Sequence, residues 1–162
     1  MRFLLILFLF SSVTFGEKPT LLLGEQPVGI DTSCSMNNFG DWLVSSTIGA
    51  YLNGKLILTG NQLGRGTLAK INDRGDWLIV SQSGLYFNGK RLLKNITLGV
   101  EFDVDLNFGG NWILAGNAIG VIVNEIQVLD QQKVGISAAV HMNDEGQWIV
   151  SSSAGVFRGT LP

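Results

Sequence analysis

The sequence predicts an all-β protein made of four repeats, each a four-stranded antiparallel blade of a closed β-propeller. Tryptophans 35, 35 and 36 residues apart mark the repeats, and asparagines and glycines recur in register with them. Between these positions, short apolar runs alternate with turn residues, as in antiparallel sheets. The four tryptophans are Trp42, Trp77, Trp112 and Trp148.

Composition limits the class of protein. The 162 residues are 46% hydrophobic and only 15% charged, with a net charge of −2. So apolar a chain is expected to fold rather than stay disordered, and a balanced charge argues against nucleic-acid binding. The length suits one domain.

The N-terminus reads as a secretory signal peptide over residues 1–16. A positive start is followed by the apolar run FLLILFLF and a tail of small residues, and the apolar run is too short to span a bilayer. We therefore expect a secreted domain over residues 17–162, free of the membrane after cleavage. Asn95 begins an Asn-Ile-Thr glycosylation acceptor for a eukaryotic host.

Each repeat predicts four strands, and the second repeat illustrates them. Asn72 and Gly75 predict a turn that ends one strand, and the apolar run 76–81 begins the next. Gly84 opens a third strand, and Asn88-Gly89 is a hairpin signal before the fourth. Because the run after the turn is apolar on both faces, we expect each sheet to be covered on both sides.

The predicted blades cover residues 31–54, 66–93, 100–129 and 135–161. The last blade lacks a fourth strand, and residues 20–23 (TLLL) match the fourth strands of other repeats. We expect this N-terminal strand to complete the last blade and close the ring, which protects both edges. An open array, or a dimer that closes an eight-bladed ring, remains as an alternative.

The repeat motif also resembles a known family. The stretch INDRG (71–75), followed by an apolar strand and GLYFNGKRLL, resembles the Asn-Asp-x-Gly extracellular repeats of the HAF type in secreted bacterial propeller-like proteins. That resemblance implies fold and export, not an activity. The same turn is similar to a shortened sialidase Asp-box, which is structural, and the third repeat departs from the motif at residues 107–110.

One polar column on the first strand of each blade breaks the repeat pattern. If these strands line the ring axis, the side chains of this column converge on a central channel, where they either bind a ligand or are simply solvated. The column consists of Ser35, Lys70, Asp105 and His141. One histidine, one cysteine and scattered aspartates predict no metal site, and we expect no cofactor. Cys34, the single cysteine, is expected to be a small buried side chain.

These observations favour a non-catalytic extracellular binding or structural domain, monomeric or homodimeric, with carbohydrate as the first ligand class and protein as another. Two alternatives stay open. The tripeptide Arg74-Gly75-Asp76 spells a cell-adhesion motif on a predicted turn, and an enzyme would use Lys70, Asp105 and His141. The tryptophans are expected to form the core between blades rather than sugar platforms.

Overall fold

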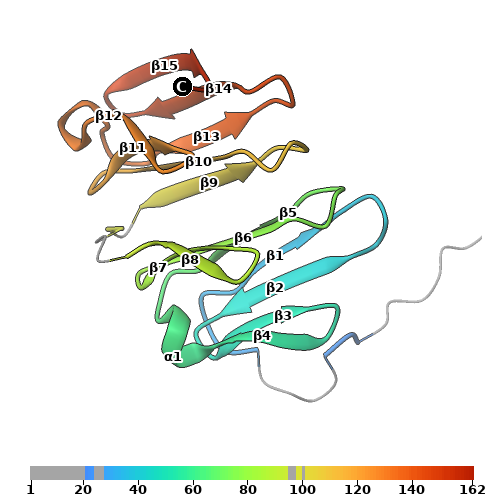
Figure 1. Ribbon diagram of the computed structural model, residues 1–162. Helices are drawn as coiled ribbons and strands as arrows, with labels where there is room; N and C mark the ends of the chain where they lie inside the picture. The colour runs from blue at the N-terminus through green and yellow to red at the C-terminus, as the bar shows by residue number, and fades with distance from the viewer. Residues whose placement is uncertain (1–20, 24–27, 95–97, 100) are drawn as a thin grey trace, which may run out of the picture.

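The computed structural model describes residues 21–23, 28–94, 98–99 and 101–162, which form four antiparallel β-sheets, one for each repeat (Figure 1). The predicted signal peptide and the predicted acceptor Asn95 lie outside the described residues.

The strands of each sheet are neighbours in chain order. The first sheet comprises β1 (Ser33–Met36), β2 (Trp42–Ser46), β3 (Gly49–Leu52) and β4 (Lys55–Thr59). The second comprises β5 (Leu68–Ile71), β6 (Trp77–Ser81), β7 (Gly84–Phe87) and β8 (Lys90–Leu93). The third comprises β9 (Phe102–Leu106), β10 (Trp112–Gly116), β11 (Gly120–Val123) and β12 (Ile126–Leu129). The fourth comprises β13 (Ala139–Met142), β14 (Gln147–Ser152) and β15 (Gly155–Thr160). The short helix α1 (Gly60–Leu63) and a 3-10 turn over Gln131–Lys133 connect successive sheets.

The predicted turn chemistry is confirmed. In the turn between β5 and β6, Asn72 Oδ1 accepts hydrogen bonds from the backbone N–H groups of Arg74 and Asp76, at 3.0 and 2.9 Å. Gly75 has a φ of +81°, which a glycine adopts without strain. The hairpin between β7 and β8 places Asn88 and Gly89 at φ +48° and +85°, and Asn88 Oδ1 accepts from the Trp77 N–H.

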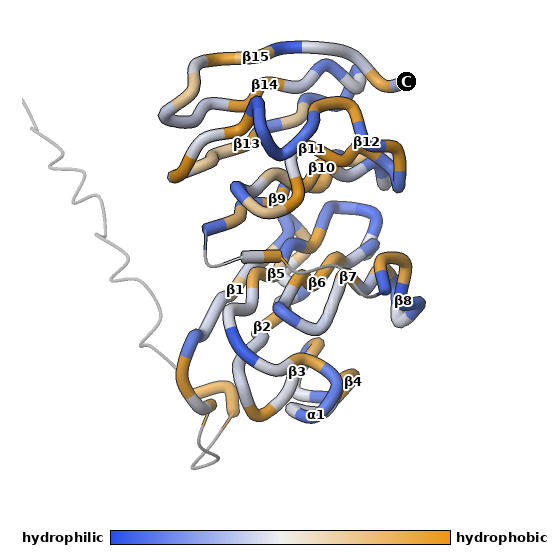
Figure 2. The backbone as a smooth tube through the Cα atoms, turned by 90° about the vertical axis from the view of Figure 1, so that its left-hand side faces the viewer, coloured by the Kyte–Doolittle hydropathy of each residue, from blue (hydrophilic) through white to orange (hydrophobic). Residues whose placement is uncertain are grey.

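The four sheets stack face to face in chain order (Figures 1 and 2). A separate apolar cluster fills each of the three spaces between successive sheets. Every residue of β6 and β10 is buried, so the second and third sheets are covered on both sides as expected. The same expectation is wrong for the first and fourth sheets, because no sheet among the described residues lies on their outer faces. Trp77, Trp112 and Trp148 belong to these clusters, as expected for core residues, whereas Trp42 does not, because it lies on the uncovered outer face of the first sheet beside Met36.

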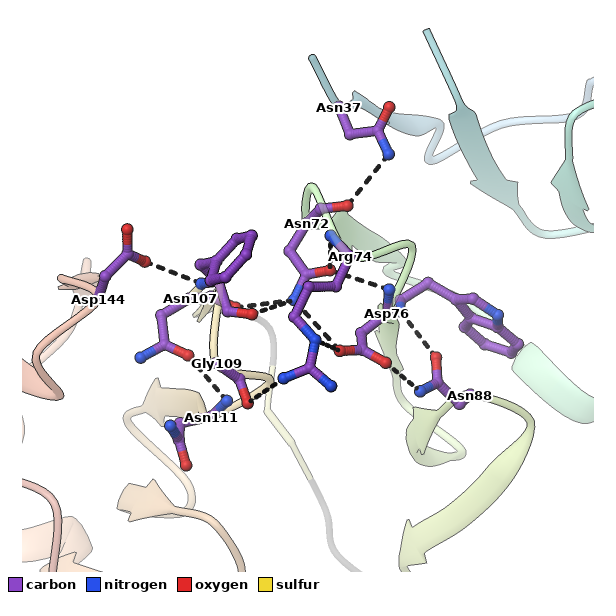
Figure 3. A network of polar contacts seen from close by, with 11 residues as sticks. Asn37, Asn72, Arg74, Asp76, Asn88, Asn107, Gly109, Asn111 and Asp144 are labelled. Atoms are coloured by element: carbon purple, nitrogen blue, oxygen red, sulfur yellow. Dashed lines mark hydrogen bonds and ion pairs between the residues drawn. The ribbon is translucent and has the colours of Figure 1, made fainter. Parts of the chain in front are cut away.

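A ladder of asparagine side chains ties each repeat to the next. The side-chain amide of Asn37 donates to the backbone carbonyl of Asn72 at 3.1 Å. Asn72 donates in the same way to Asn107 at 2.8 Å, and Asn107 donates to Asn143 at 3.0 Å. Figure 3 shows this ladder around Asn72. The repeated asparagine therefore shapes its own turn and also joins neighbouring repeats.

The first strands of the sheets are edge strands, and side chains of the preceding repeat satisfy some of their N–H groups. Ser35 Oγ in β1 accepts from the N–H of Ile71 in β5 at 3.2 Å. Asp105 Oδ2 in β9 accepts from the N–H of Met142 in β13 at 2.9 Å. Such bonds draw successive first strands side by side and cover edges that would otherwise pair with other chains.

The described residues form an open stack, not the closed ring expected from the sequence. Residues 21–23 belong to no strand, Leu21 is 74% exposed, and the fourth sheet has the three strands β13, β14 and β15. The first and fourth sheets lie at opposite ends of the stack (Figure 1). Contacts along the first strands join β1 to β5, β5 to β9 and β9 to β13, so each repeat adds to the one before it.

Two smaller expectations are also wrong. The first sheet extends to Thr59, beyond the predicted end at residue 54, because the run 55–59 pairs with β3 as β4. Cys34 is exposed rather than buried, because it lies on the outer face of the first sheet, which none of the other three sheets covers.

Candidate binding groove beside the first turns

A polar groove of about 270 Å³ lies beside the turns that follow β5, β9 and β13. Backbone stacking brings these three turns together, so the groove combines side chains from three repeats. Its lining residues are Asn72, Asp73, Asp105, Leu106, Asn107, Phe108, His141, Met142 and Asp144.

Asp105 is the electrostatic centre of the groove. Its Oδ2 atom lies 2.8 Å from His141 Nδ1 and also accepts the Met142 N–H, whereas Oδ1 lies 3.8 Å from Lys70 Nζ. The Asp105 side chain is 13% exposed, and that of His141 is 74% exposed. A mostly buried carboxylate therefore holds an imidazole that remains open to solvent.

Phe108 supplies an apolar wall, and its backbone is held from both sides. Its N–H donates to Asp144 Oδ1 at 2.8 Å, and its carbonyl accepts from the Asn72 side-chain amide at 3.3 Å. Figure 3 shows Asn72 and Asp144 approaching this turn from neighbouring repeats. Phe108 is 52% exposed. A fixed, half-exposed aromatic ring beside carboxylates and amides is a surface suited to amphipathic ligands.

The predicted polar column is brought together in part. Lys70, Asp105 and His141 come within ion-pair distance along successive first strands, although no closed channel surrounds them. Ser35 lies in β1, outside the groove lining, and its hydroxyl accepts the Ile71 N–H. The column thus joins repeats through side-chain contacts, and two of its members face the groove.

The tripeptide Arg74-Gly75-Asp76 lies in the turn between β5 and β6. Arg74 Nε is 3.7 Å from Asp76 Oδ2, and Arg74 also donates to the Gly109 carbonyl at 3.5 Å (Figure 3). Asp76 Oδ1 accepts from the Asn88 side-chain amide at 2.8 Å. Both charged side chains therefore make contacts within the protein.

Sequence reasoning missed Phe108 as a groove residue. The equivalent positions in the other repeats hold Asn38, Asp73 and Asp144, so an aromatic ring interrupts a polar column. This departure from a polar column is the sequence signal that points to Phe108, just as the varied polar column points to Lys70. The groove itself requires the stacking of three turns, which no single repeat encodes.

Among the described residues, no three His, Cys, Asp or Glu side chains come together in a way that could hold a metal ion. Asp73, Asp105 and Asp144 line one groove but do not form such a cluster. No helix in the described ranges is long and apolar enough to cross a membrane.

Comparison with known proteins does not extend this description. No family model matches the chain, and no curated protein is similar to it.

Proposed function

We propose that this chain is a secreted, non-catalytic binding module whose groove beside the first turns binds a carbohydrate. The composition of the groove is the observation that carries the proposal: carboxylates, side-chain amides and an imidazole surround one half-exposed aromatic ring. The signal-like N-terminus supports action outside the cell.

Sugars need these two kinds of group together. Their hydroxyls both donate and accept hydrogen bonds, which matches the carboxylate oxygens of Asp73 and Asp144 and the exposed imidazole of His141. Their C–H faces are apolar and pack on aromatic rings, and Phe108 is such a ring. The groove has about 270 Å³, below the 300–1,000 Å³ of pockets for drug-sized ligands, so we expect one or two sugar units to be bound.

Binding to a glycan array, followed by calorimetry with the glycans that bind, tests the proposal. Phe108→Ala removes the ring, and we expect its affinity to fall about tenfold, or about 1.4 kcal/mol. Phe39→Ala is the matched control, because Phe39 is a 77% exposed ring on the first turn of the first repeat, outside the groove. Absence of any bound glycan, or equal affinity of Phe108→Ala and the wild type, would contradict the proposal.

The pair of His141 and Asp105 favours hydrolysis as a second candidate function. A carboxylate that holds one imidazole nitrogen orients the ring, as in the base of catalytic triads, and leaves the other nitrogen available to a water molecule. The groove lining, however, includes no Ser, Thr, Cys or Lys as a nucleophile. Mass spectrometry of a bound glycan after incubation separates the two functions: cleavage that His141→Ala abolishes supports an enzyme, and an intact glycan supports a binding module.

A further inference from the structure

The outer face of the first sheet is apolar across all four strands. The strand register places Cys34, Val44, Tyr51 and Leu56 in one row from β1 to β4, and Met36 lies beside Trp42. We call these six residues the first face. None is an Asp, Glu, Lys, Arg or His, and Met36 and Leu56 are 63% and 48% exposed.

The same face is covered in the second repeat. There the equivalent residues Ala69, Ile79 and Tyr86 pack against the first sheet and are at most 4% exposed. In the second repeat, therefore, the positions equivalent to the first face are buried by the neighbouring sheet. Among the described residues, no sheet lies on the first face.

The opposite end of the stack carries charged and polar side chains beside the exposed apolar residues Ile149 and Val156. On the outer face of the fourth sheet, His141, Ile149 and Arg158 form one row. Arg158 replaces residues that are apolar in the equivalent strand positions, namely Leu52, Phe87 and Val123. Charged and polar side chains on an outer face are how terminal repeats end a stack.

The last asparagine of the ladder is also satisfied without another repeat. Asn143 donates to Glu145 Oε2 at 3.3 Å and to Gln147 Oε1 at 3.0 Å, both in its own turn. The fourth repeat therefore needs no further sheet, whereas the first repeat presents an apolar face.

We propose that two copies of this chain associate through their first faces, independently of the proposed groove. The dimer would be a continuous stack of eight sheets with a polar fourth sheet at each end. An uncharged apolar face is complementary to itself, and a symmetric contact closes at two copies. A head-to-tail contact would instead bury the Arg158 guanidinium, together with the His141–Asp105 pair, against apolar side chains, which is unfavourable because these polar groups would lose water.

The size of the face determines how tight the dimer is. With strands about 4.8 Å apart and about 3.3 Å per residue, the sheet has a projected area of roughly 300 Å². This is smaller than the roughly 800 Å² that each partner buries in a standard interface, so we expect a weak dimer that dissociates on dilution. Cys34 lies on this face, so dimerisation also shields its thiol.

Sedimentation velocity over a dilution series of the purified chain, in reductant, tests the proposal. The wild type is expected to change from dimer to monomer on dilution. Val44→Arg puts a charge in the middle of the first face and is expected to stay monomeric throughout. Ile149→Arg is the matched control on the fourth sheet, and it is expected to dimerise like the wild type. Circular dichroism checks that each variant folds. If Val44→Arg does not fold, Leu56→Arg on the edge strand β4 takes its place.

Thiol labelling gives an independent readout. Labelling of Cys34 is expected to slow as the wild-type concentration rises but to stay fast in Val44→Arg. A wild type that is monomeric at every concentration would overturn the proposal. So would dissociation by Ile149→Arg, which would indicate a head-to-tail ring or filament. Slow labelling of Cys34 even in the dilute monomer would also overturn it, because the chain's own residues would then cover the face.

Discussion

A single asparagine in each repeat has two structural roles. The side-chain oxygen of Asn72 accepts two backbone N–H groups in its own turn, and its side-chain amide donates to the backbone carbonyls of Asn107 and Phe108 in the next. Asn72 is 7% exposed, so water cannot easily replace these partners. The sequence predicted the turn from Asn and Gly spacing. It did not predict the contact between repeats, which depends on how two distant turns approach each other.

The asparagine ladder leads to a stability prediction at the residue scale. Asn72→Ala removes bonds on both sides of the turn, and we expect it to lower the free energy of unfolding by about 2 to 3 kcal/mol. Asn143→Ala is the comparison, because the Asn143 side chain bonds only within its own repeat and its backbone carbonyl, which accepts from Asn107, is kept; we expect less than half that loss. Urea denaturation measures both values. Equal losses in the two variants would show that the contact between repeats adds nothing.

Asp41 leads to a prediction about pH. Hydrogen bonds from the side-chain amides of Asn53, chiefly, and Asn37 lower the pKa of Asp41 below its usual 3.8, whereas burial opposes them. Because the folded pKa is depressed, the carboxylate stabilises the fold above the unfolded pKa, and this contribution is lost as pH falls through the folded pKa. The stability difference between wild type and Asp41→Asn should therefore hold steady near neutral pH and shift against the wild type below pH 3.8. Urea denaturation at several pH values measures it, and a difference that does not change down to the acid limit of folding would contradict the prediction.

At the scale of strands and turns, most of the structure could be predicted from the sequence. Second strands begin at Trp42, Trp77 and Trp112, and third strands begin at Gly49, Gly84, Gly120 and Gly155. Local chemistry explains this agreement, because Asn-Gly pairs and apolar runs act over a few residues. The third repeat reaches the same hairpin without glycine, since Asn124 and Glu125 adopt φ values of +47° and +72°.

Two turn glycines differ in whether a side chain would collide with the surrounding chain, although both have a positive φ. Gly75 and Gly120 have φ values of +81° and +76°, so alanine is strained at either position. A Cβ on Gly75 meets nothing within 4 Å, whereas one on Gly120 collides with the Leu129 carbonyl. We expect Gly75→Ala to cost about 1 to 2 kcal/mol and Gly120→Ala at least about 2 kcal/mol more. Thermal unfolding of the two variants checks this difference. Similar melting temperatures would show that β11 and β12 can move apart to accept the Cβ without loss of stability.

At the scale of the whole molecule, the sequence predicted the number of sheets and their order but not how they are arranged. A period of about 35 residues determines that each repeat forms one sheet. The same period is compatible with a closed ring and with an open stack, so it does not distinguish the two. The rotation between sheets depends on contacts such as Asp105 with Met142 and Asn107 with Asn143, which join residues 36 or 37 positions apart. The groove results from the same stacking. Its polar column could be predicted from the repeat positions, but its lining could not, because it combines turns from three repeats.

The polar end of the stack gives the last prediction. Arg158 occupies a strand position that is apolar in the three other sheets, and it lines a hollow of about 570 Å³ with His141 and Ile149. Arg158→Phe restores the apolar pattern of Leu52, Phe87 and Val123, so it removes the charge that keeps this face in water. The fourth sheet of one copy can then receive the first face of another, and a head-to-tail contact that does not close continues into filaments. Light scattering is expected to show concentration-dependent growth beyond a dimer in Arg158→Phe and none in Arg158→Lys, which keeps the charge. If Arg158→Phe scatters like Arg158→Lys at every concentration, the charge at position 158 is not what ends the stack.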